Sequence, residues 1–565
     1  MTRLTGSRQL AEMLRAYSVD HVFFVPAILM QALAEMERVG IRRVMTHSEI
    51  AAAYMADGYG RASGKPGFCM AQNVGGSNLA AGLRDARMGC SPVIAITGGP
   101  SVATRYRNQY QEVDHFGQFD PVTKFNAVVE NVARLPDLVR QAFREATGGA
   151  PGPVHLQMGS NLGELAEGEA AGGVQVQPEY CRAPSVRTPA AQDQIDAAIH
   201  RLLSAKRPVL VAGGGVATSG ARAEVVELAE RLGMPVATSL NGKGTIPDGH
   251  PLALGVVGAY ARECANRVVS MADLVVFVGS RTGSQVTNGW SVPAQASSIV
   301  HIDIDSREPG RNYPDTCAVV GDARSVVRQL IAALGRRAAV PVNGDWAEQA
   351  RRLVAEWRES ERAAAMSAAE PIRPERLCRA ISEALPDDAV LVADTGHSGL
   401  WSGPLIDLVR PGQRYIRCAG SLGWSFPAAL GVKCALPQRT VVCFNGDGAF
   451  YYHMAELETA ARHGINVVVV VNNNSAFNQE IRLVNEAYDG IPGQRQHDLW
   501  KFRDVNFAAI AESLGCVGMR VTAPEQLSAT LTRAIDAGRP VVVDVVTDVR
   551  AMAKRAWKPG ASPAP

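Results

Sequence analysis

A carboxylate and an amide follow two apolar, β-branched runs in the last third of the chain. Asp447 lies in a Gly-Asp-Gly triplet directly after TVVCFN, and Asn474 closes an Asn-Asn-Asn triplet directly after INVVVVV. The two residues are 27 positions apart, which leaves room for one helix between two strands. A right-handed crossover would return the chain beside its starting strand, so both side chains would meet at one sheet edge. Their oxygens suit a hard cation such as Mg²⁺, which commonly joins protein oxygens to phosphates.

Small residues around Asp447 suit the other half of such a site. Gly446 and Gly448 would let backbone N–H groups approach a diphosphate, and the N-terminus of a following helix would favour its negative charge. A Gly-Asp-Gly triplet alone is weak evidence because many turns contain it, whereas the Asn triplet at this spacing makes the combination specific. We therefore predict Gly446, Gly448, Ala449 and Asn473 as cofactor contacts.

Strands must position these side chains, and the sequence offers many. Short apolar runs bounded by glycine or polar turns are typical of strands buried on both faces of a parallel sheet. Helix-favouring segments rich in Ala, Leu, Glu and Arg lie between them, and the alternation predicts an α/β protein of three doubly wound parallel-sheet domains. Connector-like stretches at 164–190 and 334–372 divide the chain into domains 1–165, 190–340 and 370–550. The strand-like runs are 21–27, 92–99, 208–215, 272–280, 297–305, 389–396, 440–448, 465–474 and 540–548.

Size and composition exclude several classes of protein. With 565 residues the chain is too long for one core, and its 47% hydrophobic and 20% charged residues are ordinary for a globular protein. The net charge of +2 favours no partner, and no basic stripe with interleaved aromatics is present. No run approaches ~20 apolar residues, and the first residues do not form a signal peptide. The ten cysteines lack CxxC spacing and fit a reduced core. We expect a cytoplasmic protein without nucleic-acid or membrane partners.

The Gly-Asp-Gly triplet followed by the Asn pair resembles the thiamine-diphosphate signature of the acetolactate synthase and pyruvate decarboxylase superfamily. The resemblance covers nearly the whole chain, in the order pyrimidine-binding, central and diphosphate-binding domain, and points to an acetolactate synthase large-subunit-like protein. It implies thiamine diphosphate and Mg²⁺ as cofactors. By the family's spacing, Asp447 and Asn474 bind Mg²⁺ through their side chains and Ala476 through its backbone carbonyl.

Residues 46–67, THSEIAAAYMADGYGRASGKPG, resemble the family segment whose glutamate contacts the aminopyrimidine ring of the cofactor. Glu49 is that residue here. A buried glutamate before an apolar helix is costly without a partner. A proton shared with the pyrimidine N1′ would satisfy it and promote the imino tautomer that deprotonates the thiazolium C2. The alternative is a carboxylate that only stabilises a helix start.

A glycine-rich segment, Gly420-Ser421-Leu422-Gly423, resembles the family loop beside the cofactor. In the family, the carbonyl at the position of Gly420 accepts from the 4′-amino group. A bulky apolar residue, here Leu422, wedges the cofactor into its bent shape and brings the 4′-nitrogen near C2. Without the resemblance, the segment is simply a glycine-rich helix start.

Upstream, Asp394, Gly396 and His397 end another strand-like run and resemble the loop that contacts the diphosphate. His397 would donate to a phosphate oxygen, or it would lie as a solvated loop histidine. Both interpretations stay open.

The central domain raises the question of a second cofactor. Its glycines at 213–215 do not form GxGxxG, because Thr218 occupies the place of the third glycine, so the dinucleotide fingerprint fails. In acetolactate synthases this domain binds FAD, and Arg281 matches a family arginine there. Other members leave the domain empty or bind a different nucleotide, so FAD is one candidate among these.

Two features depart from acetolactate synthase although Gln111 matches it. Gln111 lies where that enzyme has Phe-Gln-Glu and is expected to face the substrate. However, Met158-Gly159-Ser160 replaces the synthases' Pro-Lys-Asp, and no tryptophan follows the Asn pair in SAFNQEIRLVNEAYDG. In the synthases that tryptophan favours 2-oxobutyrate as acceptor, so these differences weaken the case for a branched-chain biosynthetic role.

His115 and Glu480 are further candidates, because pyruvate decarboxylase has a histidine pair near the first position and a catalytic glutamate at the second. As a hypothesis, they move protons on the substrate side. The alternative is a surface loop histidine and an ordinary helix glutamate.

The leading prediction is a thiamine-diphosphate-dependent carboligase or lyase that acts on a 2-oxo acid. The C2 carbanion would attack the carbonyl, CO₂ would leave, and the enamine would meet a proton or a second carbonyl. Alternatives are a simple decarboxylase, an acyloin or diketone lyase, and a catalytically silent paralogue. Glu49 and the metal ligands fall on different predicted domains and the family builds each site from two chains, so we expect a homodimer or homotetramer.

Overall fold

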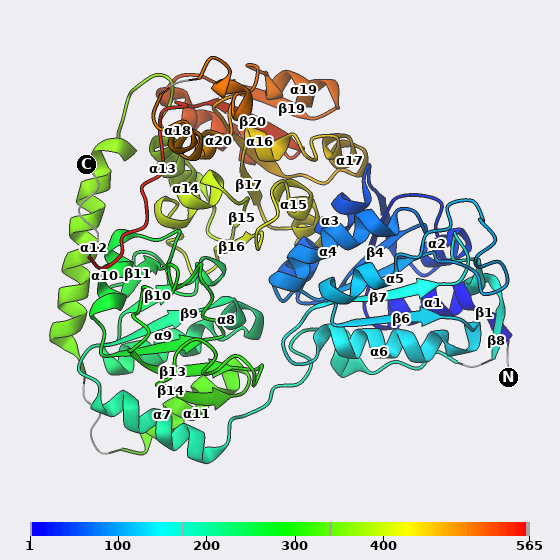
Figure 1. Cartoon of the computed structure of the whole chain (residues 1–565), viewed down its shortest axis with the longest axis horizontal. Coiled ribbons are helices and arrows are strands. Elements are labelled where there is room, and N and C mark those ends of the chain that lie inside the picture. The colour runs from blue at the N-terminus through cyan, green and yellow to red at the C-terminus, as the bar shows by residue number, and fades with distance from the viewer. Residues whose placement is uncertain (1–2, 172, 338–341, 492, 561–565) are drawn as a thin grey trace.

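The computed structural model describes residues 3–171, 173–337, 342–491 and 493–560 and contains three six-stranded sheets (Figure 1). All strand pairs in these sheets are parallel, and helices flank each sheet. The predicted fold class, three doubly wound parallel sheets, is confirmed. Each sheet with its helices is called a lobe below. The exact domain boundaries stay predictions, and their residues 1–2 and 338–340 lie outside the described residues.

The first lobe has the strand order β3-β2-β4-β5-β7-β6. A short antiparallel pair, β1 (Arg3–Thr5) with β8 (Glu169–Ala171), closes it. The sheet strands are β2 (His21–Phe24), β3 (Arg42–Met45), β4 (Gly67–Ala71), β5 (Val93–Thr97), β6 (Phe125–Val129) and β7 (Pro153–Met158). The helices are α1 (Gly6–Ala16), α2 (Met30–Arg38), α3 (Glu49–Ser63), α4 (Gly76–Met88), α5 (Phe116–Phe119) and α6 (Leu135–Thr147).

The central lobe has the strand order β11-β10-β9-β12-β13-β14. Its long helix α12 (Gly344–Ala365) packs on α10 and α13 and runs along the margin shared with the third lobe (Figure 1). The strands are β9 (Pro208–Ala212), β10 (Val236–Thr238), β11 (Ala253–Val256), β12 (Leu274–Val278), β13 (Ser298–Asp303) and β14 (Thr316–Val320). The other helices are α7 (Gln192–Ser204), α8 (Gly214–Ser219), α9 (Arg222–Leu232), α10 (Glu263–Met271) and α11 (Ala323–Gly335).

The third lobe has the strand order β16-β15-β17-β18-β20-β19. The predicted runs at 389–396, 440–448 and 465–474 form three neighbouring strands, so their carboxyl ends lie at one edge. The strands are β15 (Val390–Ala393), β16 (Arg414–Arg417), β17 (Val441–Gly446), β18 (Val468–Asn473), β19 (Val517–Val521) and β20 (Val541–Val546). The helices are α13 (Pro374–Ala384), α14 (His397–Leu405), α15 (Ser425–Ala435), α16 (Asp447–Phe450), α17 (Glu456–His463), α18 (Ile481–Ala487), α19 (Phe507–Ser513) and α20 (Leu527–Asp536).

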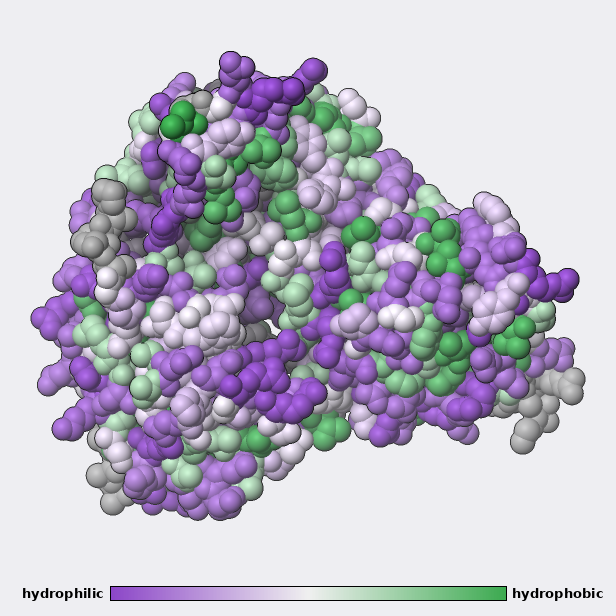
Figure 2. Space-filling view, in the orientation of Figure 1, coloured by the Kyte–Doolittle hydropathy of each residue, from purple (hydrophilic) through white to green (hydrophobic). Residues whose placement is uncertain are grey.

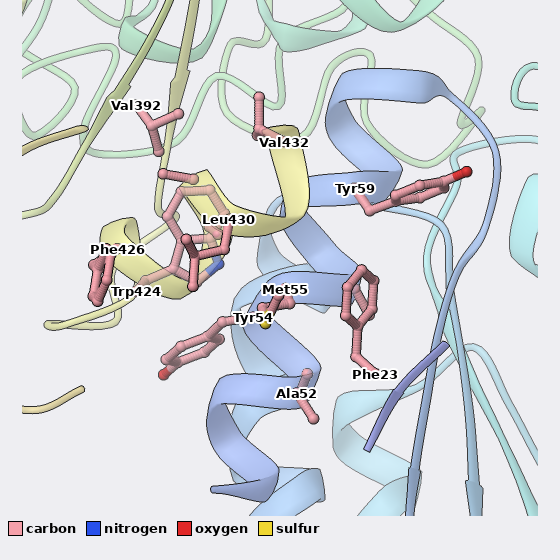
Figure 3. Packing of buried hydrophobic residues seen from close by; sticks show 14 of the residues in the cluster. Phe23, Ala52, Tyr54, Met55, Tyr59, Val392, Trp424, Phe426, Leu430 and Val432 are labelled. Atoms are coloured by element: carbon pink, nitrogen blue, oxygen red, sulfur yellow. The ribbon is translucent and has the colours of Figure 1, made fainter. Parts of the chain in front are cut away.

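Helices α3 and α15 join the first lobe to the third (Figure 3). Ser48 caps the start of α3 by accepting from the N–H of Ala51, and Gly64 ends it in the left-handed region at φ 75°. Between its ends α3 is buried almost throughout, unlike a surface helix. Trp424, directly before α15, and Leu430 within it lie in one core with Tyr54 and Met55 of α3. The two helices therefore form a buried contact between the predicted pyrimidine-binding and diphosphate-binding domains.

Candidate active site

Three strand ends meet at the proposed site in the third lobe. Gly446 pairs with Asn472 across β17 and β18, and Ala393 pairs with Phe444 across β15 and β17. Asp447 is the first residue of α16, directly after β17. The open crevice beyond the carboxyl ends of parallel strands is where such sheets bind ligands.

Asp447 is almost completely buried, and its carboxylate accepts two backbone hydrogen bonds. The N–H of Gly448 donates to Oδ1 at 2.8 Å, and the N–H of Ala476 donates to Oδ2 at 3.1 Å. Burial raises the pKa of Asp447 to about 7, and the donated N–H groups oppose that rise. A divalent cation would offset the desolvation that raises the pKa.

The neighbouring strand β18 leads to Asn474, whose amide oxygen has no hydrogen-bond partner in the described structure. The Oδ1 atom of Asn474 is buried and has no hydrogen-bond partner among the described residues. A buried acceptor left in this way is costly unless something else binds it. No group of three or more His, Cys, Asp or Glu side chains that could hold a metal occurs in the described part of the chain. The donor set here, one carboxylate, one amide oxygen and a backbone carbonyl, instead suits Mg²⁺ completed by phosphate oxygens.

Asn473 has a different surrounding from Asn474. Its Nδ2 donates to Asp544 Oδ1 at 2.8 Å and to the Val505 carbonyl at 3.0 Å, and its Oδ1 accepts from the N–H of Ser475 at 3.3 Å. These bonds tie the end of β18 to β20 and shape the turn that presents Asn474. Cofactor contact by Asn473 stays a prediction.

The glycines of the triplet differ in what they allow. A Cβ on Gly448 would lie 2.2 Å from the Phe477 ring, so only glycine fits there. A Cβ on Gly446 would meet nothing closer than Ser398 Oγ at 3.7 Å. Ala449 is buried in α16. Gly448 therefore permits the close approach of α16 to the loop that follows Asn474.

Asp394 holds a loop of its own lobe. Its fully buried carboxylate accepts from the N–H of Gly423 at 3.1 Å and from the N–H of Ser425 at 2.8 Å, and burial raises its pKa. Gly420 is exposed and Leu422 is half-buried, so the middle of the loop is accessible to a ligand. Asp394 thus shapes the segment that the resemblance assigns to the aminopyrimidine.

His397 starts α14, next to Gly396 with φ 61°. Its Nδ1 lies 2.6 Å from Asn478 Oδ1, and the Nδ2 of Asn478 donates to the carbonyls of Val549 and Ala551. The amide orientation makes Nδ1 of His397 the donor, so a neutral ring presents Nε2 as an acceptor. Burial lowers the pKa of His397. Donation to a phosphate therefore requires the doubly protonated ring, which a bound diphosphate would favour.

Glu49 is the first residue of α3 and is half-buried. Asn78 Nδ2 donates to its Oε2 at 3.2 Å, and a Cβ on Gly75 would lie 2.5 Å from its Oε1. Among the described residues, no hydrogen bond or ion pair joins Glu49 to Asp447 or Asn474. The carboxylate is thus positioned within its own lobe, beside the glycine-rich start of α4.

Gln111 lies in the loop after β5 with φ 61°. Its Oε1 accepts from Asn161 Nδ2 at 3.0 Å, and its carbonyl accepts from Asn73 Nδ2 at 2.9 Å. The Oδ1 atoms of Asn73 and Asn161 are buried without a partner in the described structure. An amide cluster therefore surrounds Gln111 at the carboxyl edge of the first sheet, and orphaned acceptors there are suited to a ligand's donors.

His115 is completely buried within a hydrogen-bonded series. Its Nδ1 lies 3.3 Å from the Val113 carbonyl and its Nε2 lies 3.1 Å from Thr97 Oγ1. Thr97 Oγ1 lies 2.8 Å from His155 Nε2, and His155 Nδ1 lies 2.8 Å from Asn126 Oδ1. The two ends of the series, the Val113 carbonyl and Asn126 Oδ1, are both acceptors. Two neutral imidazole rings and one hydroxyl carry three protons, so one of the four contacts has no proton to share. Burial lowers the pKa of both histidines. The structure thus engages both nitrogens of His115 inside the fold.

Glu480 ends the short 3-10 helix η6 (Asn478–Glu480) and is half-buried. Its side chain has no hydrogen bond or ion pair with the described residues. It follows Asn478, the partner of His397, so it lies near the predicted diphosphate loop. Its proton-transfer role stays a prediction.

Several residues at the site were not predicted from the sequence. Asp85 of α4 accepts from the loop at 419–421, Asp544 of β20 fixes Asn473, and Asn478 fixes His397. A signal existed for the first: Asp85 interrupts an apolar helical run, SNLAAGLRDARMG, and a buried carboxylate needs a partner. Nothing in the sequence indicated which partner.

Models of three thiamine pyrophosphate enzyme domains match this chain in order. The N-terminal TPP binding domain matches residues 4–117, the central domain residues 195–330 and the C-terminal TPP binding domain residues 394–545. A probable acetolactate synthase large subunit of Methanocaldococcus jannaschii is 32% identical over 96% of this chain and 92% of its own length. The chain belongs to the thiamine pyrophosphate enzyme family. The acetolactate synthase isozyme 3 large subunit of Escherichia coli is 30% identical over 97% of this chain and 96% of its own length.

The predicted resemblance is therefore confirmed. This thiamine pyrophosphate enzyme is similar to acetolactate synthases along nearly its whole length, which makes it a thiamine-diphosphate-dependent, acetolactate-synthase-like enzyme. In the described part of this enzyme, no helix is both long enough and apolar enough to span a membrane.

Proposed function

We propose that this enzyme binds thiamine diphosphate through Mg²⁺ and joins the fragment left when a 2-oxo acid loses CO₂ to a second carbonyl compound. The observation that carries the proposal is the buried, unpartnered Oδ1 of Asn474 at the strand edge that also presents the buried carboxylate of Asp447. These two side chains and the carbonyl of Ala476 would hold the metal. The backbone around Gly446, Gly448 and Ala449 would face the diphosphate.

When bound, thiamine diphosphate supplies a nucleophilic carbon and an electron sink, while the protein orients it and excludes water. Glu49 would hold a proton against the pyrimidine N1′. The Gly420 carbonyl would accept from the 4′-amino group, and Leu422 would support the bent shape. Asp394 supports this arrangement because it holds the segment directly after Leu422 through hydrogen bonds from the N–H groups of Gly423 and Ser425.

The 2-oxo acid is proposed from the relatives, whose printed names are acetolactate synthases. Asn73 and Asn161, the amide neighbours of Gln111, have unpartnered acceptors that a substrate could use. Glu480 is a candidate proton carrier there. His115 would act only indirectly, because it is fully buried.

A second cofactor is proposed for a cavity of about 610 Å³ between the three lobes. Figure 2 shows the surface hollowed where the lobes meet, with hydrophilic residues at its rim. Arg281 lines this cavity and donates to the Met88 carbonyl at 3.4 Å. The basic lining suits the diphosphate of a dinucleotide, and FAD is the candidate that the family offers. The lining arginines are Arg61, Arg182, Arg187, Arg222, Arg281, Arg324, Arg414 and Arg417.

The visible spectrum of the purified enzyme tests this second cofactor. Bound FAD would give the enzyme a flavin absorbance, and heating would release the flavin into the supernatant. A colourless protein that gains no flavin absorbance after incubation with FAD and gel filtration would contradict the FAD assignment.

The main proposal is tested by NMR of the products from pyruvate, with the purified enzyme, thiamine diphosphate and Mg²⁺, beside the variant Glu49→Gln. We expect acetolactate, and a fall in its rate of about 10²-fold or more in Glu49→Gln, in keeping with the loss of a general acid or base. The variant should still bind the cofactor, since the metal ligands lie in another lobe.

Each other outcome changes the proposal in a defined way. Acetaldehyde as the sole product would replace the carboligase by a decarboxylase. Cofactor binding without any product would exclude pyruvate as donor and direct the assay to bulkier 2-oxo acids, acyloins and diketones. A chain that binds the cofactor and turns over none of them would be a silent paralogue.

A further inference from the structure

The loop between β16 and α15 has an unusual source for its hydrogen bonds. A loop's backbone N–H groups must find partners when they are removed from water. The N–H of Ala419 donates to Asp85 Oδ1 at 2.7 Å, and the N–H groups of Gly420 and Ser421 donate to Asp85 Oδ2 at 3.1 and 3.0 Å. Asp85 belongs to α4 of the first lobe and is completely buried. One carboxylate of another lobe therefore satisfies three successive amides of the loop.

This arrangement fixes the direction of the Gly420 carbonyl. A peptide group is planar and trans, so its C=O and N–H point in opposite directions. The Gly420 carbonyl shares a peptide with the Ser421 N–H, which is held against Asp85, so that carbonyl must point away from α4. On the other side of Leu422, the Gly423 N–H is held against Asp394. Two buried carboxylates from two lobes thus set the peptide planes that flank Ser421 and Leu422.

The charge around Asp85 explains why it stays in place. Arg61 of α3 pairs with Asp85 Oδ1 at 2.8 Å and with Asp57 through two bonds of 2.7 Å. The same guanidinium donates to the Arg417 carbonyl, and Trp424 Nε1 donates to Asp57 Oδ2 at 2.8 Å. Two carboxylates share one guanidinium, so one negative charge remains for neutral donors to stabilise. The three loop amides are those donors at Asp85, and charge-assisted bonds of this kind are the stronger ones.

We propose that Asp85 is a positioning residue, which reaches across from the first lobe to aim the Gly420 carbonyl and the Leu422 side chain at the aminopyrimidine of thiamine diphosphate. This inference rests on the proposed function of the loop. Asp85 itself would not touch the cofactor. It acts by holding the loop in its binding shape before the cofactor arrives, which lowers the cost of binding.

The variant Asp85→Asn is a sharp test because each carboxylate oxygen of Asp85 accepts hydrogen bonds from two donors. Oδ1 faces Ala419 N–H and Arg61, and Oδ2 faces Gly420 and Ser421 N–H. Whichever way the amide of an asparagine turns, its NH₂ group meets two donors. We expect the dissociation constant for thiamine diphosphate, measured by titration calorimetry at saturating Mg²⁺, to rise on the order of tenfold or more. The near-ultraviolet circular dichroism of the bound cofactor should change as well.

Asp57→Asn is the matched control. It also removes one of the two carboxylates around Arg61, but Asp57 contacts no loop amide, and an asparagine can still accept from Trp424. Its dissociation constant should stay within twofold of the unmodified enzyme, with the same cofactor dichroism. A general weakening of the contact between lobes would affect both variants alike and would overturn the specific role of Asp85.

The remaining outcomes are also decisive. If the unmodified enzyme does not bind thiamine diphosphate, both the proposed function and this inference fail. If it binds and Asp85→Asn binds equally well with unchanged dichroism, only the inference fails. If Asp85→Asn does not fold, amide hydrogen exchange of the cofactor-free enzyme decides: the amides of 419–421 should be protected, and rapid exchange there would overturn the proposal.

Discussion

His155 is held neutral because its surroundings cannot replace the water that a cation would lose. Its ring stacks on Phe119 with the ring centroids 3.5 Å apart, and among the described residues its nitrogens contact Thr97 and Asn126 alone. Burial lowers its pKa well below the usual value, and the nearby His115 adds to that. In the unfolded chain the ring titrates near 6.5. Below that pH the unfolded chain binds a proton that the folded protein does not, so acid destabilises the fold.

The variant His155→Gln tests whether this histidine makes the fold less stable in acid. Between pH 7 and pH 5, the neutral His155 ring should lower the free energy of unfolding by roughly 2 kcal/mol. His155→Gln removes this contribution, so its melting temperature should fall less between these two pH values than that of the unmodified enzyme, whatever its value at pH 7. His200→Gln, at an exposed position, should behave like the unmodified enzyme. An undiminished fall in His155→Gln would mean that His155 carries its charge in the folded protein.

At the scale of elements, the contact between α3 and α15 depends on glycine. A Cβ on Gly431 would lie 1.9 Å from the Met55 carbonyl oxygen, and a Cβ on Gly58 would lie 2.2 Å from that of Ala428. Gly431→Ala should therefore force the helices apart and cost about 1–3 kcal/mol, seen as a lower melting temperature. Gly335→Ala, at the exposed end of α11 with nothing nearer than 3.9 Å, should be neutral or stabilising. Equal melting temperatures for the two variants would contradict the close contact.

Features set by neighbouring residues could be predicted from the sequence, and contacts between distant segments could not. Strands such as β17 and β18 were predictable because their apolar runs reflect burial on both faces. The pairing of Asp447 with the Asn triplet was predictable because a crossover unit sets their spacing. Asp85 and Asp57 were not, because their partners at 419 and 424 lie 334 and 367 positions away along the chain. Local patterns report periodicity and burial, whereas the meeting of α4 with a loop of the third lobe depends on how whole lobes dock. His115 shows the same limit, since its loop position concealed complete burial.

At the scale of the whole molecule, Glu49 and Asp447 lie in different lobes, and each is anchored within its own lobe. If each active site combines the first lobe of one chain with the third lobe of another, two inactive variants should rescue one another. Glu49→Gln and Asp447→Ala, mixed under conditions that exchange subunits, form hybrids in which one site carries both defects and the other carries none. Random pairing should then restore about 25% of the activity of the unmodified enzyme.

Asp447→Ala mixed with Asn474→Ala is the control, because both defects lie in the third lobe and no pairing gives an intact site. Recovery in the first mixture alone would assign the site to two chains, whereas no recovery in either, with exchange demonstrated by differently tagged chains, would assign Glu49 and the metal ligands to the same chain.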